Sequence, residues 1–315
     1  MSSRNNIIIG TRGSELALWQ SNWVARELQH LHPSLRIEKT VIKTTGDKIL
    51  DSPLSKIGDK GLFTKEIEHA LLEKTIDLAV HSLKDVPTNL AAGLTIGAIT
   101  EREDVRDVFI SHPKKKYRSF SAVPKNGSIA TGSLRRKCQL LNHRPDLQII
   151  DIRGNLKTRK AKLEDSEWDG MLLAKAGVTR LGWSEIISEV LPPTLILPAV
   201  GQGALAIEIR CDDTFLASAV EPLNHLPTVQ STAGERALLR FLEGGCQIPI
   251  GTYGRIESGK FFLDAVVGSV DGKKIVRGAI HGVPDDSEKL GVSLAQELLN
   301  NGADQILEEI RITDN

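Results

Sequence analysis

Residues 7–40 read IIIGTRGSELALWQSNWVARELQHLHPSLRIEKT, which is an apolar β-rich run, a helical pattern and a second β-rich run. The same alternation continues through about the first two hundred residues, and it is typical of parallel strands joined by crossover helices. Beyond this stretch we expect further strands at 77–80, 128–131, 148–152 and 170–173. The sequence therefore predicts an α/β fold for this part of the chain.

The sequence pattern changes after residue 250. Strand-like runs at 265–270 and 275–279 flank Asp271-Gly272, a pair that is typical of the turn in a two-residue type I′ hairpin. We expect a small antiparallel domain there, followed by two helical runs that Gly302 separates. Because 315 residues exceed what one ordinary hydrophobic core organises, we expect two or three domains in all.

Composition and charge argue against several classes of protein. The 40 basic residues balance 40 acidic ones and aromatic residues make up only 4% of the chain, so neither the positive surface nor the stacking platform of a nucleic-acid binder is indicated. The apolar run within the first nine residues is too short for a signal peptide or a membrane span. We therefore expect a protein without nucleic-acid or membrane partners.

The three cysteines, Cys138, Cys211 and Cys246, are odd in number and far apart in the sequence. This spacing argues against a disulfide framework and favours a reducing compartment, so we expect a cytoplasmic protein. The eight histidines form no His-Glu-x-x-His motif, and the cysteines show no paired spacing. No metal site is predicted on this basis.

Polar and cationic side chains follow four of the predicted strands. Ligands of open α/β sheets bind beyond the carboxyl ends of the strands, so these residues are candidates for a binding site. In chain order they are Arg12 and Ser14, then Lys84 and Asp85, then Ser133, Arg135 and Arg136, and finally Arg153, Asn155 and Arg159. Because guanidinium groups bind carboxylates through paired hydrogen bonds, several together predict a ligand with many carboxylates or phosphates. The alternative is that each arginine pairs with a surface acid.

Three of these residues have a more specific interpretation. Ser133 and Asn155 are favourable N-cap residues, which would place helix N-termini beside the arginines. Asp85 is the acid among the cations, so it would stabilise a developing positive charge or move a proton. Its alternative role is a helix cap or an ion pair with Lys84.

Cys246 is the cysteine that we expect to be exposed on a turn. It follows the glycines 244–245, which end a helical pattern that a capping box at 232–235 would begin. Cys138 and Cys211 occupy positions that are typical of packing residues. Nothing in the local sequence activates the Cys246 thiol, so an unreactive exposed cysteine is the alternative.

Gly201, Gly203 and Ala206 match the pattern of a dinucleotide-binding turn. That turn should open a helix, whereas residues 204–209 alternate like a strand. We therefore interpret the glycines as a hinge or crossover. A nicotinamide-dependent oxidoreductase is accordingly a weaker alternative for the function.

Six segments of the chain together resemble the porphobilinogen deaminase family. They are residues 10–20, 81–87, 131–140, 153–159, 197–204 and 242–251, of which the last two read LPAVGQGA and LEGGCQIPIG. The resemblance spans nearly the whole chain. It implies two α/β lobes like those of periplasmic binding proteins, with the active cleft between them, and a small α+β domain with an antiparallel three-stranded sheet. The implied boundaries are 1–103 with 201–222, then 104–200, and finally 223–315.

The resemblance also implies a reaction. Members of the family are transferases of tetrapyrrole and heme biosynthesis that carry a dipyrromethane primer, and its thioether maps here onto Cys246. Four porphobilinogen molecules are added head to tail, and each loses ammonia to give a cationic azafulvene that the growing chain attacks. Hydrolysis then releases hydroxymethylbilane. A monomeric enzyme is implied.

The family's site residues carry over to positions of this sequence. Asp85 would contact pyrrole N–H groups and stabilise the azafulvene. The primer's carboxylates would be held by Lys84, Ser133, Arg135 and Arg136, and the substrate and growing chain by Arg12, Ser14, Arg153, Arg159 and Arg180. Lys56, Lys60 and Phe63 would belong to a lid at or beside the segment 44–61. Gly132 departs from many relatives, which have a hydroxyl residue there.

A non-catalytic, two-lobed binder of a small polycarboxylate would use the same lobes and the same cations. Fold alone does not separate these two functions. Cys246 favours the enzyme, because a binder needs no covalently held primer. A periplasmic binder would also carry a signal sequence.

Overall fold

The computed structural model describes residues 5–48, 63–242 and 248–314. These residues divide into two compact units. The first unit holds the described residues up to 103 together with Gly203–Val229, and the second holds Asp104–Gln202 and the described residues from 230 onward. Among these residues, none of the helices is long and apolar enough to cross a membrane.

The first unit is built on a five-stranded sheet with the strand order β2-β1-β3-β10-β4. The strands are β1 (Asn6–Thr11), β2 (Arg36–Val41), β3 (Leu78–Ser82), β4 (Leu94–Ile99) and β10 (Leu205–Arg210). β1 pairs in parallel with β2 and β3, whereas β10 runs antiparallel to β3 and β4. Only part of the expected parallel pairing is found, because the chain re-enters this unit at residue 203 and adds β10 in the opposite direction.

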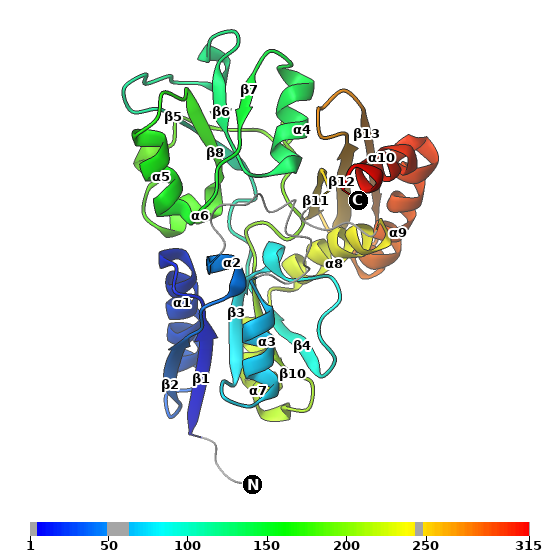
Figure 1. Cartoon of the computed structure of the whole chain (residues 1–315). Coiled ribbons are helices and arrows are strands. Elements are labelled where there is room, and N and C mark those ends of the chain that lie inside the picture. The colour runs from blue at the N-terminus through cyan, green and yellow to red at the C-terminus, as the bar shows by residue number, and fades with distance from the viewer. Residues whose placement is uncertain (1–4, 49–62, 243–247, 315) are drawn as a thin grey trace. The chain divides into compact units, whose positions relative to one another are not determined.

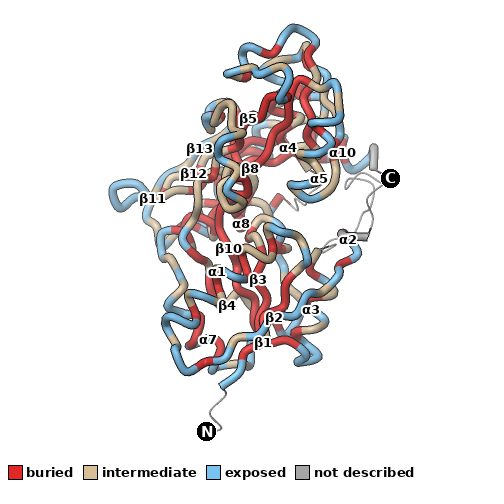
Figure 2. The backbone as a smooth tube through the Cα atoms, turned by 90° about the vertical axis from the view of Figure 1, so that its left-hand side faces the viewer, coloured by how far each residue is buried: buried red, intermediate tan, exposed pale blue. Residues whose placement is uncertain are grey.

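Helices cover both faces of this sheet (Figure 1). They are α1 (Glu15–Leu31), α3 (Lys65–Leu72) and α7 (Thr214–Val220), with shorter helices at α2 (Thr45–Lys48), Leu83–Asp85 and Glu221–Leu223. Side chains alternate along β1, so Ile7 and Ile9 pack with α1 and α7 on one face while Ile8 packs with α3 on the other. Figure 2 shows the central strands β1, β3 and β10 as largely buried.

The second unit contains another five-stranded sheet, in the order β7-β6-β8-β5-β9. Its strands are β5 (Asp107–Ser111), β6 (Ser128–Ala130), β7 (Gln148–Ile150), β8 (Gly170–Ala174) and β9 (Glu189–Val190). β6 is parallel to β7 and β8, and β5 is antiparallel to β8 and β9. α4 (Leu134–His143) covers one face, and α5 (Leu156–Glu164) and α6 (Lys175–Arg180) cover the other. Short 3-10 helices lie at Phe120–Ala122 and Ser184–Ile186.

A separate antiparallel sheet of three strands completes this unit, as the sequence predicts. Its strands are β11 (Ile250–Glu257), β12 (Lys260–Gly268) and β13 (Ile275–Gly282). Its core includes apolar side chains from α8 (Leu226–Phe241), α9 (Ser287–Leu298) and α10 (Asp304–Asp314), and a 3-10 helix lies at Pro284–Asp286. Gly302 has a φ of 100° within Leu299–Ala303 and interrupts the helical run between α9 and α10, as predicted.

The two-residue hairpin predicted at Asp271-Gly272 is wrong. Residues 269–274 connect β12 to β13, although Gly272 does adopt the positive φ, 73°, that a turn there requires. The two-residue turn lies instead between β11 and β12 at Ser258-Gly259, where both φ angles are positive, 50° and 74°. The signal for it is the Ser-Gly dipeptide between two apolar runs.

α4 packs against the end of β12 and against the loop that follows it. An added Cβ at Gly268 would come within 2.2 Å of Cys138 Sγ, and Asn142 Nδ2 donates a hydrogen bond to the Gly272 carbonyl oxygen at 3.0 Å. Cys138 is fully buried, so this cysteine is a packing residue, as predicted, and the same burial raises the pKa of its thiol to about 12. The same prediction for Cys211 is wrong, because Cys211 lies just beyond the end of β10 and is exposed.

Candidate active site

Arg135 and Arg136 lie in the first turn of α4, and both are only 5% exposed. Ser133 caps this helix, as predicted, and its hydroxyl accepts a hydrogen bond from Arg136 N at 3.4 Å. Such a cap satisfies one of the amide donors that every helix start leaves free. α4 therefore presents two neighbouring guanidinium groups from a fixed helix end.

Both guanidinium groups contact a single carboxylate, that of Asp107 at the start of β5. Arg135 Nη1 donates to Asp107 Oδ2 and Arg136 Nη2 donates to Oδ1, each at 2.8 Å. Gln202 Nε2 donates to the same Oδ1 at 2.9 Å. The sequence gives no local signal for Asp107 or Gln202, because their contacts join residues 28 to 95 positions apart. We refer to Asp107, Arg135 and Arg136 as the Asp107 cluster.

The Asp107 cluster contains more positive than negative charge. Two guanidinium groups share one carboxylate, and their other hydrogen bonds go to the neutral carbonyl oxygens of Leu197 and Leu172. Burial by itself would raise the pKa of Asp107, but the charges and hydrogen bonds of the two arginines outweigh it and hold this pKa well below its ordinary value. The Nε of each arginine is buried and makes no hydrogen bond within the described residues. Excess charge and unpaired donors are both costly when buried, so the cluster is suited to bind a further anion.

Further cations belong to α5, to α6 and to the loop before α5, and these two helices cover the other face of the same sheet. Asn155 caps α5, as predicted, and Gly154 before it has a φ of 112° and accepts a hydrogen bond from Arg159 Nε at 2.8 Å. Arg153 is partly buried, and its Nη1 makes no hydrogen bond within the described residues. Arg180 ends α6 and is also partly buried. Three predicted substrate arginines thus belong to α5, to α6 and to the loop before α5.

Gly132 joins β6 to the cap of α4, in close contact with the chain beside it. An added Cβ would lie 2.5 Å from the Ile152 carbonyl oxygen, and a backbone atom does not move aside as the tip of a side chain would. We therefore expect Gly132→Ser to lower the free energy of unfolding by about 1–3 kcal/mol. Denaturant titration of the wild type and the variant measures this change, and equal midpoints and slopes would contradict the close contact.

In the first unit, Arg12 lies directly against Phe63. The guanidinium carbon is 4.1 Å from the centre of the ring, which is the geometry of a cation–π contact. Gly46 lies against the same ring, since an added Cβ there would come within 2.2 Å of it. Ser14 caps α1 through a hydrogen bond that its hydroxyl accepts from Ala17 N at 3.3 Å. The predicted lid residue Phe63 therefore contacts a predicted substrate residue.

Lys84 and Asp85 follow β3 directly, in the short 3-10 helix at Leu83–Asp85. Leu83 is buried, and its amide donates to the Ala204 carbonyl oxygen at 3.0 Å. Asp85 is exposed and Lys84 is partly buried. The turn is thus fixed by its buried leucine, while the carboxylate at its end remains accessible.

Glu235 has a different role from the one predicted. The capping box at 232–235 is wrong, because α8 begins at Leu226 and these residues lie inside the helix. The Glu235 carboxylate is buried and accepts hydrogen bonds from the amides of Gly201 and Gly254, each at 2.7 Å. Gly201 and Gly203 have φ angles of 71° and 96°, and strand β10 follows them. The chain passes from the second unit to the first between Gln202 and Gly203, so the interpretation of these glycines as a crossover is confirmed.

Three predicted site residues, Cys246, Lys56 and Lys60, lie outside the described residues, so their roles stay predictions. Within the part of the chain that the structure describes, no three His, Cys, Asp or Glu side chains gather as ligands of a metal ion would.

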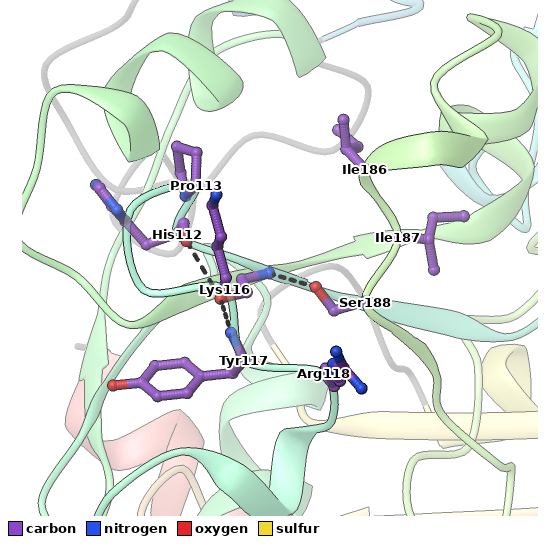
Figure 3. Close-up of a pocket in the computed structure, with 9 residues that line it drawn as sticks. His112, Pro113, Lys116, Tyr117, Arg118, Ile186, Ile187 and Ser188 are labelled. Atoms are coloured by element: carbon purple, nitrogen blue, oxygen red, sulfur yellow. Dashed lines mark hydrogen bonds between the residues drawn. The ribbon is translucent and has the colours of Figure 1, made fainter.

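A pocket of about 400 Å³ lies in the second unit, and Figure 3 draws the residues that line it. It is lined by residues 111–113, 116–118 and 186–188. Hydrogen bonds from Ser111 N to Ser188 Oγ (3.0 Å) and from Tyr117 N to Ser111 Oγ (2.8 Å) hold its wall together. None of the residues predicted for the site lines this pocket, so it is not the site that the sequence predicts.

Comparison with known proteins identifies the family. The family model described as "Porphobilinogen deaminase, dipyromethane cofactor binding domain" matches residues 7–218, and that described as "Porphobilinogen deaminase, C-terminal domain" matches residues 229–300. The chain belongs to the porphobilinogen deaminase family. A porphobilinogen deaminase of Carboxydothermus hydrogenoformans is 53% identical over 308 residues, which cover 98% of each chain. Those of Chlorobium phaeobacteroides and Chlorobaculum tepidum are 54% identical over 314 and 313 residues, with 98% of this chain and 99% of theirs covered.

Solved structures of other proteins are more distantly similar. The periplasmic VFT2 domain of Bordetella pertussis BvgS has a TM-score of 0.42 and 11% identity, covering 75% of this chain and 94% of that chain. The aliphatic sulphonate binding protein SsuA of Escherichia coli has a TM-score of 0.40 and 13% identity, covering 76% and 70%. Likenesses of this size support no inference about function, and the fold described here rests on the sheets themselves.

Proposed function

We propose that this protein is a transferase that joins four porphobilinogen molecules head to tail, with loss of ammonia, into hydroxymethylbilane on a covalently bound dipyrromethane. The observation that carries the proposal is the Asp107 cluster, a buried pair of guanidinium groups with one positive charge in excess, in a chain of the porphobilinogen deaminase family. A polycarboxylate binder would also use cations. The match to both the cofactor-binding and the C-terminal family models favours the enzyme.

The residues at the start of α4 fit a primer that carries several carboxylates. Each arginine of the Asp107 cluster keeps a buried Nε–H without a partner among the described residues, and the cluster lacks one negative charge for balance. Arg135 and Arg136, with Lys84 and Ser133, would hold the carboxylates, and Cys246 would hold the primer by a thioether. When bound, the dipyrromethane would supply the free α-carbon to which the first pyrrole is joined.

The remaining cations would bind incoming substrate. Every porphobilinogen brings an acetate and a propionate, so each addition increases the negative charge that the protein must neutralise. Arg12, Ser14, Arg153, Arg159 and Arg180 would receive these carboxylates. The ring of Phe63 would orient the guanidinium of Arg12, because the two groups are already in contact. Lys56 and Lys60 would cover the bound molecules together with Phe63.

Asp85 would act on the reacting substrate. Loss of ammonia from porphobilinogen leaves a cationic azafulvene, and a carboxylate close to it lowers the energy of that cation. Asp85 suits this role because it is exposed at the end of the 3-10 helix that follows β3, and this turn is held by buried Leu83. Accessible charge on a fixed turn is what transition-state stabilisation requires.

We also propose three domains, at 1–103 with 201–222, at 104–200 and at 223–315, and a monomer in the cytoplasm. The apolar core around β11, β12 and β13 supports a third domain, because it is formed by helices and strands from residue 238 onward. The odd number of widely spaced cysteines supports a reducing compartment.

Incubation of the purified protein with porphobilinogen tests the proposed function. We expect four molecules of porphobilinogen to disappear and four of ammonia to appear for each hydroxymethylbilane, which is measured as uroporphyrin after ring closure and oxidation. If calorimetry showed that porphobilinogen binds but the assay showed that it is not consumed, the protein would be the polycarboxylate binder. That result would contradict the proposal.

A further inference from the structure

Asp107 receives donors from two separate parts of the second unit. Arg135 and Arg136 reach it from α4, and Gln202 reaches it from the crossover segment. Its side chain is fully buried. A carboxylate that accepts three hydrogen bonds in such a place is held rigidly, and it holds its donors equally rigidly.

The charges around Asp107 do not balance. The two arginines contribute two positive charges and Asp107 contributes one negative charge. Gln202 is neutral, and the backbone oxygens of Leu197 and Leu172 complete the remaining contacts of the guanidinium groups. Burial lowers the pKa of Arg135, and the positive charge of Arg136 lowers it further. The negative charge of Asp107 raises it, but not enough to cancel the other effects, as expected when two cations share one anion. One of the two guanidinium charges therefore has no carboxylate of its own among the described residues.

We propose that Asp107 is a positioning residue that offsets one of the two guanidinium charges, and thereby sets how strongly Arg135 and Arg136 bind the carboxylates of the primer. This inference rests on the proposed function. The Asp107 carboxylate and the primer's carboxylates then act on the same two cations. Removal of the Asp107 charge should therefore lower the Tm of the unprimed protein. It should also increase the amount by which the bound primer raises the Tm.

A thermodynamic cycle of four proteins measures this coupling. They are the wild type, Asp107→Asn, Cys246→Ser, which cannot form the thioether, and the double variant. Intact mass establishes which of them carry the primer. We expect the difference in Tm between primed and unprimed protein to widen by about 2 °C or more in the Asp107→Asn background. An unchanged or smaller difference would overturn the inference, because a residue that served stability alone would lower both values equally.

Asp146→Asn is the matched control. Asp146 pairs at 2.7 Å with Arg144, the C-cap residue of α4, so its replacement also removes a carboxylate from an arginine at an end of this helix. We expect its Tm difference between primed and unprimed protein to equal that of the wild type. A widening as large as that of Asp107→Asn would show a general effect of charge and would overturn the assignment to Asp107.

A second measurement keeps the inference testable if Asp107→Asn does not fold. Succinate is added to unprimed Cys246→Ser protein and to Cys246→Ser with Arg135→Gln. If Asp107 offsets one charge, Arg135→Gln removes the whole excess and abolishes the rise in Tm with succinate. If succinate still raised the Tm of the Arg135→Gln variant by about half as much, the charge of Arg136 would not be offset by Asp107. That result would overturn the inference. A wild type without primer would instead contradict the proposed function itself.

Discussion

Asp85→Asn is expected to lower turnover of porphobilinogen by about 10²- to 10⁴-fold while the protein stays folded and primed. The substitution keeps the shape of the side chain but removes the negative charge that would stabilise the azafulvene. Asp85 is exposed, and the turn that carries it is fixed by buried Leu83, so the fold does not depend on this carboxylate. Steady-state kinetics measure the loss, and thermal denaturation together with intact mass show that fold and primer are retained.

Asp212→Asn provides the control for this measurement. Asp212 is also exposed and follows a strand of the same sheet, β10, but has no predicted role in the site. Its turnover should equal that of the wild type. Near-normal turnover of Asp85→Asn would contradict the assignment of Asp85 as the catalytic carboxylate. The proposed mechanism would then have no residue that stabilises the cationic azafulvene.

Arg135→Leu and Arg136→Leu are each expected to reduce the fraction of primed protein at least about tenfold, because charged hydrogen bonds to a carboxylate contribute roughly 1.5–3 kcal/mol each. The isolated variants should then have the mass of the bare chain. Each variant keeps the other arginine against Asp107, so the buried carboxylate still has a cationic partner and the protein should fold. Intact-protein mass spectrometry gives the primed fraction, and circular dichroism checks the fold.

Arg144→Leu is the matched change at the far end of the same helix, where Arg144 pairs with Asp146 rather than with Asp107. This control should remain fully primed. If the variants at 135 and 136 were also fully primed, the two buried arginines would serve only the structure of the lobe, and the site would have to be sought elsewhere.

Features that depend on neighbours in sequence were predicted well. Ser133 and Asn155 were identified as N-caps, and each accepts the amide of the third residue beyond it, because capping is decided within one helical turn. Gly302 interrupts the helices where expected, since only local backbone conformation is involved. The cations at strand ends could be found for the same reason: alternation of strand and helix fixes where each strand stops.

Features that depend on distant contacts could not be predicted. Asp107 looks like any acid before a strand, and its partners Arg135 and Gln202 lie 28 and 95 residues away. The capping pattern at 232–235 occurs inside α8, where Glu235 instead accepts amides from Gly201 and Gly254. Burial and tertiary hydrogen bonds decide these cases.

The hairpin was assigned to the wrong dipeptide for a related reason. Gly272 does adopt a positive φ, but the pairing of β12 and β13 ends before it is reached, and the intervening loop packs against Cys138 of α4. Ser258-Gly259, by contrast, directly joins two paired strands. Sequence shows which residues can turn, whereas packing decides where strands stop.

The central claim is that the cations of this chain hold an anionic primer attached to Cys246. Intact-protein mass spectrometry of the purified wild type and of Cys246→Ser tests it most directly. The wild type should exceed the mass of its 315 residues by one dipyrromethane, and Cys246→Ser should not. A wild type at the bare mass, or an excess mass that persists in Cys246→Ser, would contradict the claim.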